Sequence, residues 1–351
     1  MATIQTALYS WYESHKRKLP WRSENTPYHV WLSEIILQQT RVEQGLEYYD
    51  RFIARWPRLE DLAAASEEDV LKMWQGLGYY TRARNLLACA REVSEKYHGA
   101  FPADYSKLVK LKGIGGYTAA AVASIAFDLP HPVVDGNVFR VIARLKDIDI
   151  PIDSKKGADA FHALAESLLD RSQPGMHNQA MMEFGALQCV PKNPDCQACP
   201  LKQHCLAFAR GTVEQRPVKA QKAKTRIRHF NYLIFESEQD GRKCLHRRTG
   251  KDIWKNLYDF PLIESDMEMN AEQVTQTAAF QEMIGGHRHT ITDVSGRFQH
   301  KLTHQTIIAQ FIRIKLFEDL SVINGKDLLL ADEKDMDKFP VPRLIDLYLN
   351  N

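Results

Sequence analysis

Four of the six cysteines in this chain fall within residues 189–205. They follow the spacing C-x6-C-x2-C-x5-C, at Cys189, Cys196, Cys199 and Cys205. A [4Fe–4S] cluster needs one cysteine for each iron, and these cysteines can come from a short loop. Structural zinc is the alternative, although zinc sites more often pair two C-x2–4-C knuckles, and only Cys196 and Cys199 form one here. The spacing therefore favours an iron–sulfur cluster.

A carboxylic acid stands among apolar residues in the segment WLSEIILQQT, residues 31–40. On a helix, Glu34 would have Val30, Trp31 and Leu37 as neighbours about one turn away. A carboxyl group in an apolar pocket tends to keep its proton near neutral pH, which suits a general acid. The alternative is a glutamate that reaches solvent past its apolar neighbours, and position alone favours this alternative.

A second carboxylate, Asp135, ends the apolar run Pro132–Val134 and precedes Gly136 and Asn137. Because a helix is expected to follow, Asp135 or Asn137 can serve as its N-cap, and the local pattern favours that role. Capping and catalysis conflict only if backbone N–H groups occupy the whole carboxylate.

Residues 111–118, LKGIGGYT, join a short periodic segment to an alanine-rich helix. Gly113 and Gly115 flank one apolar residue and allow a tight backbone turn whose N–H groups, with the next helix N-terminus, can face an anion. The octet is similar to the helix-hairpin-helix motif, which holds DNA phosphates without reading sequence. A plain turn between two packed helices is the alternative.

The composition is that of an ordinary globular protein: 351 residues, 44% hydrophobic and 26% charged, with a net charge of +2. No apolar run approaches the roughly 20 residues of a membrane helix, and the N-terminus has no signal-peptide pattern. We therefore expect a cytoplasmic protein without membrane contact. In such a chain clustered thiols indicate metal rather than disulfides, and we expect Cys89 and Cys244 to be buried.

The hydrophobic periodicity of the sequence changes twice along the chain. Residues 1–209 show helical periodicity interrupted by glycine and proline, whereas residues 210–228 show none and hold seven basic side chains against one acidic one. We interpret 210–228 as a basic interdomain linker. Residues 229–351 contain strand-like runs, such as 232–235, 243–245 and 307–316, and a helical segment at 271–284. A smaller α+β domain is expected there.

Seven segments together carry a specific resemblance. They are LPWR, WLSEIILQQT, GLGYY, LKGIGGYTAAAVASIAF, VVDGNVFRVIARL, NQAMMEFGALQC and the cysteine series. In order and spacing the chain resembles the MutY-type adenine DNA glycosylases of the endonuclease III, or helix-hairpin-helix, superfamily, densely over residues 9–208 and faintly over 229–351. The resemblance implies an all-α helix-hairpin-helix glycosylase domain with a [4Fe–4S] cluster loop, followed by a smaller α+β domain of the MutT, or Nudix, type.

The resemblance also implies a finer division and a function. A six-helix module would span about 27–132, and a cluster module would combine 1–26 with 133–209. The activity implied is base excision repair: the enzyme flips adenine out of double-stranded DNA, where it is mispaired with 8-oxoguanine or guanine, and removes it by hydrolysis. We expect a monomer in the cytoplasm of a bacterium, associated with the nucleoid.

Roles for individual residues follow from the same resemblance. Protonated Glu34 would be the acid and ionised Asp135 would stabilise the positively charged sugar, with Tyr117 and Asn137 assisting this pair. The adenine pocket would be lined by Arg17, Leu19, Trp21, Arg22 and Gln179.

Further residues would contact the DNA itself. Gln39 and Tyr79 would enter the helix, with Gly113 and Gly115 at the phosphate backbone. In the C-terminal domain, Thr303 and His304 match part of an F-S-H segment that checks 8-oxoguanine, although Leu302 replaces its aromatic residue.

Three other functions compete with this one. A bifunctional endonuclease III-type glycosylase/AP lyase would need a lysine where this chain has Tyr117, because an amine must form the Schiff base. A Nudix pyrophosphohydrolase would need the G-x5-E-x7-R-E-x-x-E-E box, which residues 262–286 lack. A non-enzymatic iron–sulfur DNA-binding or redox protein leaves Glu34 and Asp135 without a role.

Overall fold

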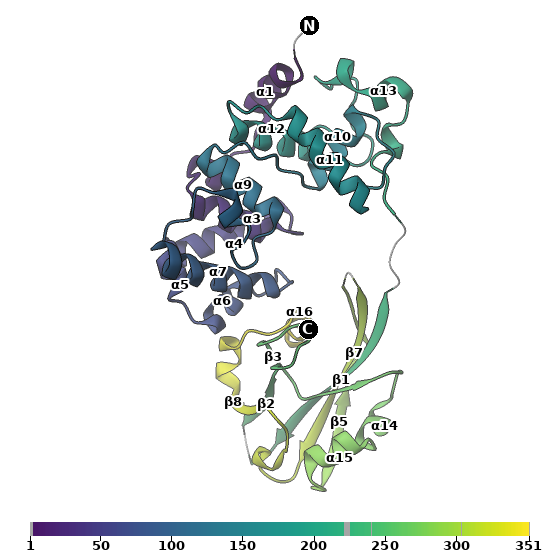
Figure 1. The fold of residues 1–351 in the computed structure, drawn as a ribbon. Helices are drawn as coiled ribbons and strands as arrows, with labels where there is room; N and C mark the ends of the chain where they lie inside the picture. The colour runs from purple at the N-terminus through teal and green to yellow at the C-terminus, as the bar shows by residue number, and fades with distance from the viewer. Residues whose placement is uncertain (1–2, 221–224, 240, 303, 351) are drawn as a thin grey trace. The chain divides into compact units, whose positions relative to one another are not determined.

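The computed structural model in Figure 1 describes residues 3–220, 225–239, 241–302 and 304–350. Contacts divide the chain into two compact units. The first combines Met1–Ala64 with Asn85–Gln221, and the second combines Ala65–Arg84 with Lys222–Asn351. From their helical periodicity, residues 65–84 were expected in the helical domain. They group with the C-terminal residues because of contacts such as the 3.2 Å hydrogen bond from the Tyr80 hydroxyl to the carbonyl oxygen of Val341.

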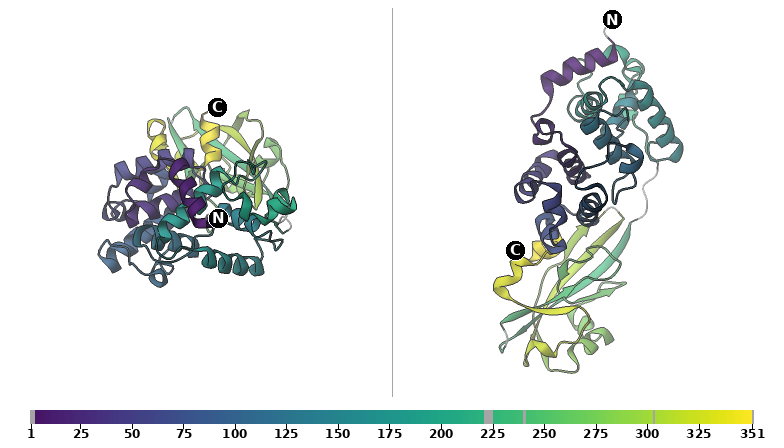
Figure 2. Two further views of the ribbon diagram at one scale, coloured as in Figure 1. Left: turned by 90° about the horizontal axis from the view of Figure 1, so that it is seen from above. Right: turned by 60° about the vertical axis from the view of Figure 1, so that its left-hand side comes forward.

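The part of the chain before residue 220 is helical, as expected from its periodicity (Figures 1 and 2). Its helices are α1 (Ile4–His15), α2 (Pro20–Ser23), α3 (Pro27–Leu37), α4 (Val42–Arg55), α5 (Leu59–Ala63), α6 (Glu67–Trp74), α7 (Thr81–Tyr97), α8 (Tyr105–Leu108), α9 (Gly116–Phe127), α10 (Gly136–Leu145), α11 (Lys155–Leu168), α12 (Pro174–Leu187) and α13 (Leu206–Arg210). Short 3₁₀ turns occupy Lys202–His204 and Val213–Gln215.

The two helices next to the candidate acids, α3 and α10, begin at side chains that cap their first turn. The Thr26 side chain accepts the backbone N–H of His29, and Pro27 occupies the first turn of α3. Asp135 caps α10 in the same way. Helix α9 is buried all round from Thr118 to Ile125, which is typical of a helix in the middle of a domain. Helices α3 and α12 both pack on it.

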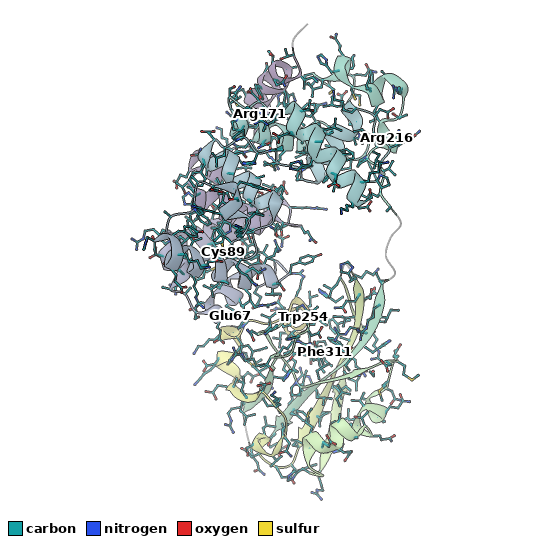
Figure 3. All side chains as sticks on the ribbon, viewed as in Figure 1. Glu67, Cys89, Arg171, Arg216, Trp254 and Phe311 are labelled. Atoms are coloured by element: carbon teal, nitrogen blue, oxygen red, sulfur yellow. The ribbon has the colours of Figure 1, made fainter. Side chains whose placement is uncertain are left out.

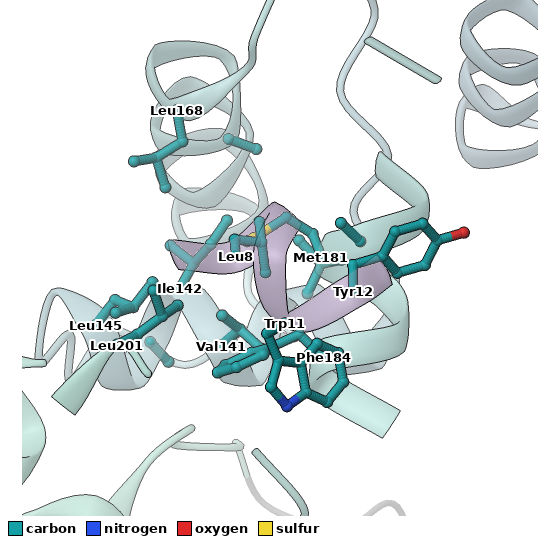
Figure 4. Close-up of a cluster of buried hydrophobic side chains, with 14 of the residues drawn as sticks. Leu8, Trp11, Tyr12, Val141, Ile142, Leu145, Leu168, Met181, Phe184 and Leu201 are labelled. Atoms are coloured by element: carbon teal, nitrogen blue, oxygen red, sulfur yellow. The ribbon is translucent and has the colours of Figure 1, made fainter. Parts of the chain in front are cut away.

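The N-terminal helix α1 packs against helices that come much later in the sequence. Leu8, Trp11 and Tyr12 of α1 share one apolar cluster with Val141 of α10 and Phe184 of α12 (Figure 4). Partly buried side chains of three of the clustered cysteines pack against the same group. The helix that precedes LPWR is therefore fixed against the region of the cysteine loop.

The second unit contains two sheets within its described residues. Their strands are β1 (Arg226–Ser237), β2 (Arg242–Arg247), β3 (Tyr258–Asp259), β4 (Leu262–Ser265), β5 (His289–Val294), β6 (Phe298–Lys301), β7 (Gln305–Leu316) and β8 (Leu328–Asp332). One sheet has the order β4-β1-β7-β5, with β6 also paired to β7, and the other has the order β3-β2-β8. Strands β1 and β7 are parallel, with Arg226 opposite Gln305 and Ser237 opposite Leu316.

Besides α6 and the start of α7, the described residues of this unit form three helices and two 3₁₀ turns after residue 222. They are α14 (Ala271–Thr275), α15 (Ala278–Ile284) and α16 (Arg343–Leu349), with 3₁₀ turns at Leu320–Val322 and Glu333–Lys338. Val274, Phe280 and Ile284 pack on the sheet residues Leu233 and Ile312. The strands expected at 232–235, 243–245 and 307–316 are confirmed, as are the buried thiols of Cys89 and Cys244 (Figure 3 labels Cys89).

Residues 271–284 are helical as expected, in two pieces: α14 ends at Thr275, and the Thr277 side chain caps α15. One expectation for the C-terminal half needs correction. Arg226 and Arg228 do not belong to an exposed linker: both lie in β1, and Arg228 is buried between Asp252 and Glu264. Lys222 and Lys224 of the expected linker lie outside the described residues.

Candidate active site

A cavity of about 620 Å³ opens in the first unit between α2, α3, α9, α10 and α12. A volume of this order suits a small organic group such as a base. Eleven of the residues singled out in the sequence line it: Arg17, Leu19, Trp21, Arg22, Glu34, Gln39, Gly115, Tyr117, Asp135, Asn137 and Gln179. Residues separated by more than 160 positions in the chain therefore meet in one pocket.

Glu34 is buried in this cavity, and the solvent-reaching alternative is wrong. Glu34 is only 9% exposed, and the Tyr117 hydroxyl donates a 2.6 Å hydrogen bond to its Oε2. Burial raises the pKa of Glu34 to about 7, with Asp135 adding to the rise, while Tyr117 and Arg22 oppose it. At neutral pH a substantial fraction of the carboxyl therefore holds its proton, as a general acid requires.

Asp135 both caps α10 and faces the cavity. Its Oδ1 accepts the Val138 N–H at 2.7 Å, and Oδ2 accepts the Asn137 side-chain amide at 2.8 Å. Burial raises the pKa of Asp135, and these hydrogen bonds work against the rise. The cap and the cavity-facing role coexist because the Val138 N–H and the Asn137 amide bind different oxygens. Asn137 is itself held by Arg140, whose guanidinium donates to Oδ1 at 2.9 Å.

The two arginines of the pocket both form ion pairs with Glu183, a residue that was not predicted from the sequence. Glu183 of α12 is buried, with its side chain 1% exposed. It accepts from the Arg17 backbone at 2.8 Å, from the Arg17 guanidinium at 2.7 and 3.0 Å, and from the Arg22 guanidinium at 2.8 and 3.0 Å. Burial alone favours the neutral acid, but the hydrogen bonds from both arginines lower the pKa of Glu183 to about 2.

The sequence held a signal for Glu183. It follows Gln179 by four residues in NQAMMEFGALQC, so both side chains lie on one face of α12. Arg17 and Arg22 would be assigned to solvent from the sequence alone, and instead they form the wall of the cavity with Glu183. The further residues that line the cavity without having been singled out include Ser33, Gln38, Thr118 and Met182.

Three of the residues singled out earlier have a positive backbone φ angle. Gly113 has φ +74°, and a Cβ there would lie 2.6 Å from Cβ of Asn85, so a side chain would be both strained and crowded. Gln39 and Tyr79 have φ of +58° and +49°, values that cost a non-glycine residue free energy. Gly113 and Tyr79 are not among the residues that line the cavity.

All four clustered cysteines line a second, smaller cavity of about 30 Å³. Its other walls include apolar side chains such as Val141, Phe184 and Leu201. Among the described residues, no group of three or more His, Cys, Asp or Glu side chains is arranged to hold a single metal ion. Burial raises the pKa of Cys199 to about 11, so this thiol needs a nearby cation to lose its proton.

The donors around the cysteine loop fit a negatively charged group bound by thiolates. The Arg144 guanidinium is buried and lies 3.4 Å from Sγ of Cys189. It also donates to the carbonyl oxygens of Val190 and Pro191, which fixes the loop around it. Thiol ligands, a buried arginine and an apolar wall are a suitable environment for an iron–sulfur cluster.

The segment expected to check the opposing base lies between β6 and β7. His304 is exposed, and its carbonyl oxygen accepts the Arg226 N–H at 3.1 Å. Thr303 lies outside the described residues. The helical region that would carry a Nudix box is α14 with α15, and its sequence lacks the R-E-x-x-E-E carboxylates.

Comparison with known proteins agrees with both halves of this architecture. Residues 32–166 match the HhH-GPD superfamily of base excision DNA repair proteins, and residues 231–351 match the NUDIX domain. A relative from Buchnera aphidicola subsp. Schizaphis graminum, named adenine DNA glycosylase, is 36% identical over 260 residues, which cover 74% of each chain. The chain belongs to the adenine DNA glycosylase family. The expected fold class, a helix-hairpin-helix glycosylase domain with a Nudix-like domain after it, is confirmed.

Two further proteins are similar to this member of the adenine DNA glycosylase family. An adenine DNA glycosylase from Arabidopsis thaliana is 37% identical over 384 residues, covering 95% of this chain, and the chain spans 60% of that relative's length. A solved thermostable thymine-DNA glycosylase is 28% identical, with a TM-score of 0.54 over 58% of this chain and 94% of the other. In the part of the chain that the structure describes, the helices are too short or too polar to cross a membrane.

Proposed function

We propose that this protein is a monofunctional adenine DNA glycosylase that removes adenine paired with 8-oxoguanine or guanine in double-stranded DNA. The observation that carries the proposal is the pair Glu34 and Asp135 in one cavity with ample room for a flipped base. A base inside a duplex must leave the stack to reach such a cavity. The names of the family relatives support adenine as the base, and the mispaired partner is part of the proposal.

The first chemical step uses the proton of Glu34. Glu34 donates it to N7 of the flipped adenine, and the glycosidic bond breaks with its electron pair going to the base. This turns adenine into a neutral leaving group, much as the acid does in sugar hydrolysis. The raised pKa of Glu34, near 7, matches this task because the group is both protonated and able to release its proton.

Asp135 stabilises the positive charge that forms on the sugar. Its carboxylate would act electrostatically or form a transient bond to C1′, and both options suit a group held by Val138 and Asn137. Water then adds to C1′ and gives a proton back to a carboxylate, which leaves adenine and an abasic site. Tyr117 fixes Glu34 through its hydroxyl and cannot form a Schiff base, so no strand cleavage is expected.

The pocket walls would choose and orient the base. Arg17 and Arg22, aligned by Glu183, present donors to the cavity, and Gln179 presents an amide that can bind a purine edge. Trp21 and Leu19 supply apolar surface for the ring. We further propose that Thr303 and His304 contact the opposing 8-oxoguanine, and that Gln39 and Tyr79 enter the helix.

The cysteine loop would hold a [4Fe–4S] cluster through Cys189, Cys196, Cys199 and Cys205. Support comes from the one cavity that all four thiols line and from the buried Arg144 guanidinium 3.4 Å from Sγ of Cys189. When bound, the cluster would order the loop and present its neighbouring basic residues to a phosphate backbone. The glycine hairpin at Gly113 and Gly115 would bind phosphate as well. The protein is proposed to act in the bacterial cytoplasm at the nucleoid, as a monomer.

A base-release assay tests the function directly. Duplexes carrying A opposite 8-oxoguanine, A opposite guanine, and an oxidised pyrimidine are incubated with the purified chain, and abasic sites are revealed with hot alkali. We expect adenine release from the first two and no strand break before alkali. Release of the pyrimidine, or trapping of the enzyme on DNA by borohydride, would instead favour the endonuclease III-type lyase.

A further inference from the structure

The loop between α6 and α7 exposes a single aromatic ring in a strained position. Tyr79 is 46% exposed, at φ +49°, between Gly78 at φ +70° and the start of α7. A non-glycine residue keeps such a backbone only when its surroundings hold it there. Because the Tyr79 ring is not packed in the core, other contacts must supply that restraint.

Arg82, in the first turn of α7, contacts this loop from two directions. Its Nη2 lies 3.4 Å from the carbonyl oxygens of both Leu77 and Gly78. Its backbone N–H donates to the carbonyl oxygen of Tyr79 at 2.8 Å. The guanidinium therefore fixes the turn on both sides of the glycine that precedes the exposed ring.

The same guanidinium lies near two aromatic rings. Its centre is 5.1 Å from the ring of Trp74 and 5.6 Å from the ring of Tyr79, both within the range of cation–π attraction. Trp74 is fully buried, and its Nε1 donates to Gly78 at 3.0 Å. Burial lowers the pKa of Arg82 to about 10, so the side chain stays cationic at neutral pH. A buried tryptophan thus anchors an arginine, and the arginine holds an exposed tyrosine.

We propose that Arg82 is a positioning residue that holds the Tyr79 ring in the orientation in which it enters the DNA stack. This rests on the proposed function of Tyr79 as one of the two residues, with Gln39, that enter the helix. A ring fixed before binding loses less conformational freedom when it inserts, so removal of the arginine should slow base extrusion.

A double-mutant cycle tests the coupling in the full-length protein. Arg82→Gln, Tyr79→Ala and the double variant are compared in single-turnover adenine release, and base extrusion is followed by the fluorescence of 2-aminopurine next to the target. We expect Arg82→Gln to slow both signals roughly tenfold in the wild-type background and less than twofold once Tyr79 is alanine. Arg51→Gln is the matched control, because Arg51 lies 4.2 Å from the ring of Tyr48 on α4.

Several outcomes would overturn the inference while leaving the glycosylase function intact. One is an equal loss from Arg82→Gln with and without Tyr79, which is what a general structural role or a direct phosphate contact would produce. Another is a wild-type rate in Arg82→Gln. If that variant fails to fold, Arg82→Lys decides by the same cycle, because lysine keeps the charge but lacks the planar guanidinium that lies near the rings of both Trp74 and Tyr79. Failure of the wild-type chain to release adenine would instead refute the proposed function.

Discussion

Replacing Glu34 with glutamine should abolish adenine release and, above neutral pH, make the folded protein more stable. Glutamine has nearly the same shape, and its carbonyl can still accept the hydrogen bond from Tyr117, but it has no acidic proton to give. General acid catalysis contributes roughly 10²–10⁴-fold, so the single-turnover rate should fall by about that factor. DNA binding should remain because the cavity keeps its shape.

The effect on stability follows from the raised pKa of Glu34, which is about 7 in the fold against 4.5 for an ordinary glutamate in water. Between these values the unfolded chain has lost the proton while the folded chain keeps it, so the free energy of unfolding falls as pH rises. The full difference corresponds to about 3 kcal/mol and is present above pH 7, whereas below about pH 4.5 it vanishes. Glu34→Gln removes this pH-dependent cost.

Urea unfolding at several pH values, followed by the circular dichroism of the helices, measures the difference between variant and wild type. The stability gained by Glu34→Gln should grow from pH 5 to pH 8 by about 2–3 kcal/mol. Glu47→Gln, at an exposed glutamate on α4, is the control and should show no such trend. A variant that keeps more than half of the wild-type rate removes Glu34 from the mechanism. A stability difference that is flat with pH refutes the reasoning about its burial.

Three other predictions concern the pocket wall, the cysteine loop and the C-terminal domain. Glu183→Gln leaves two arginines without their buried counter-charge, so it should lower the free energy of unfolding by about 3 kcal/mol and weaken the discrimination between bases. A variant with unchanged stability and discrimination would contradict the ion-pair geometry. Anaerobically purified protein should contain about four irons per chain, and Cys199→Ser should lose iron and DNA affinity more than the rate once DNA is bound; zinc without iron would show the cluster assignment to be wrong. Thr303→Ala with His304→Ala should lower the preference for 8-oxoguanine over guanine by roughly tenfold at matched salt, since two polar contacts are lost, and an unchanged preference would refute their role.

Much of the fold could be predicted because its signals are local. Helix periodicity, the Thr26 cap and the glycines of the hairpin act over a few residues, and each gives the same local structure in the fold. The strands of the C-terminal half follow equally local runs of apolar and β-branched residues. The helical segment 271–284 was also predicted, and the Thr277 cap that divides it into α14 and α15 is a local signal as well.

What only the tertiary structure decides is the chemistry that depends on long-range contacts. Its position in the sequence alone favoured a Glu34 that reaches solvent, and only packing of α3 on α9 buries it against Tyr117 and raises its pKa. Without a family resemblance, Arg22 would be assigned to the solvent-exposed surface, but α12 places Glu183 beside it. Arg228 was expected in an exposed linker, but it lies in β1 between the carboxylates of Asp252 and Glu264. The sequence determines residue types and local geometry, whereas burial and charge pairing depend on which distant segments meet, and they set the protonation state of each group.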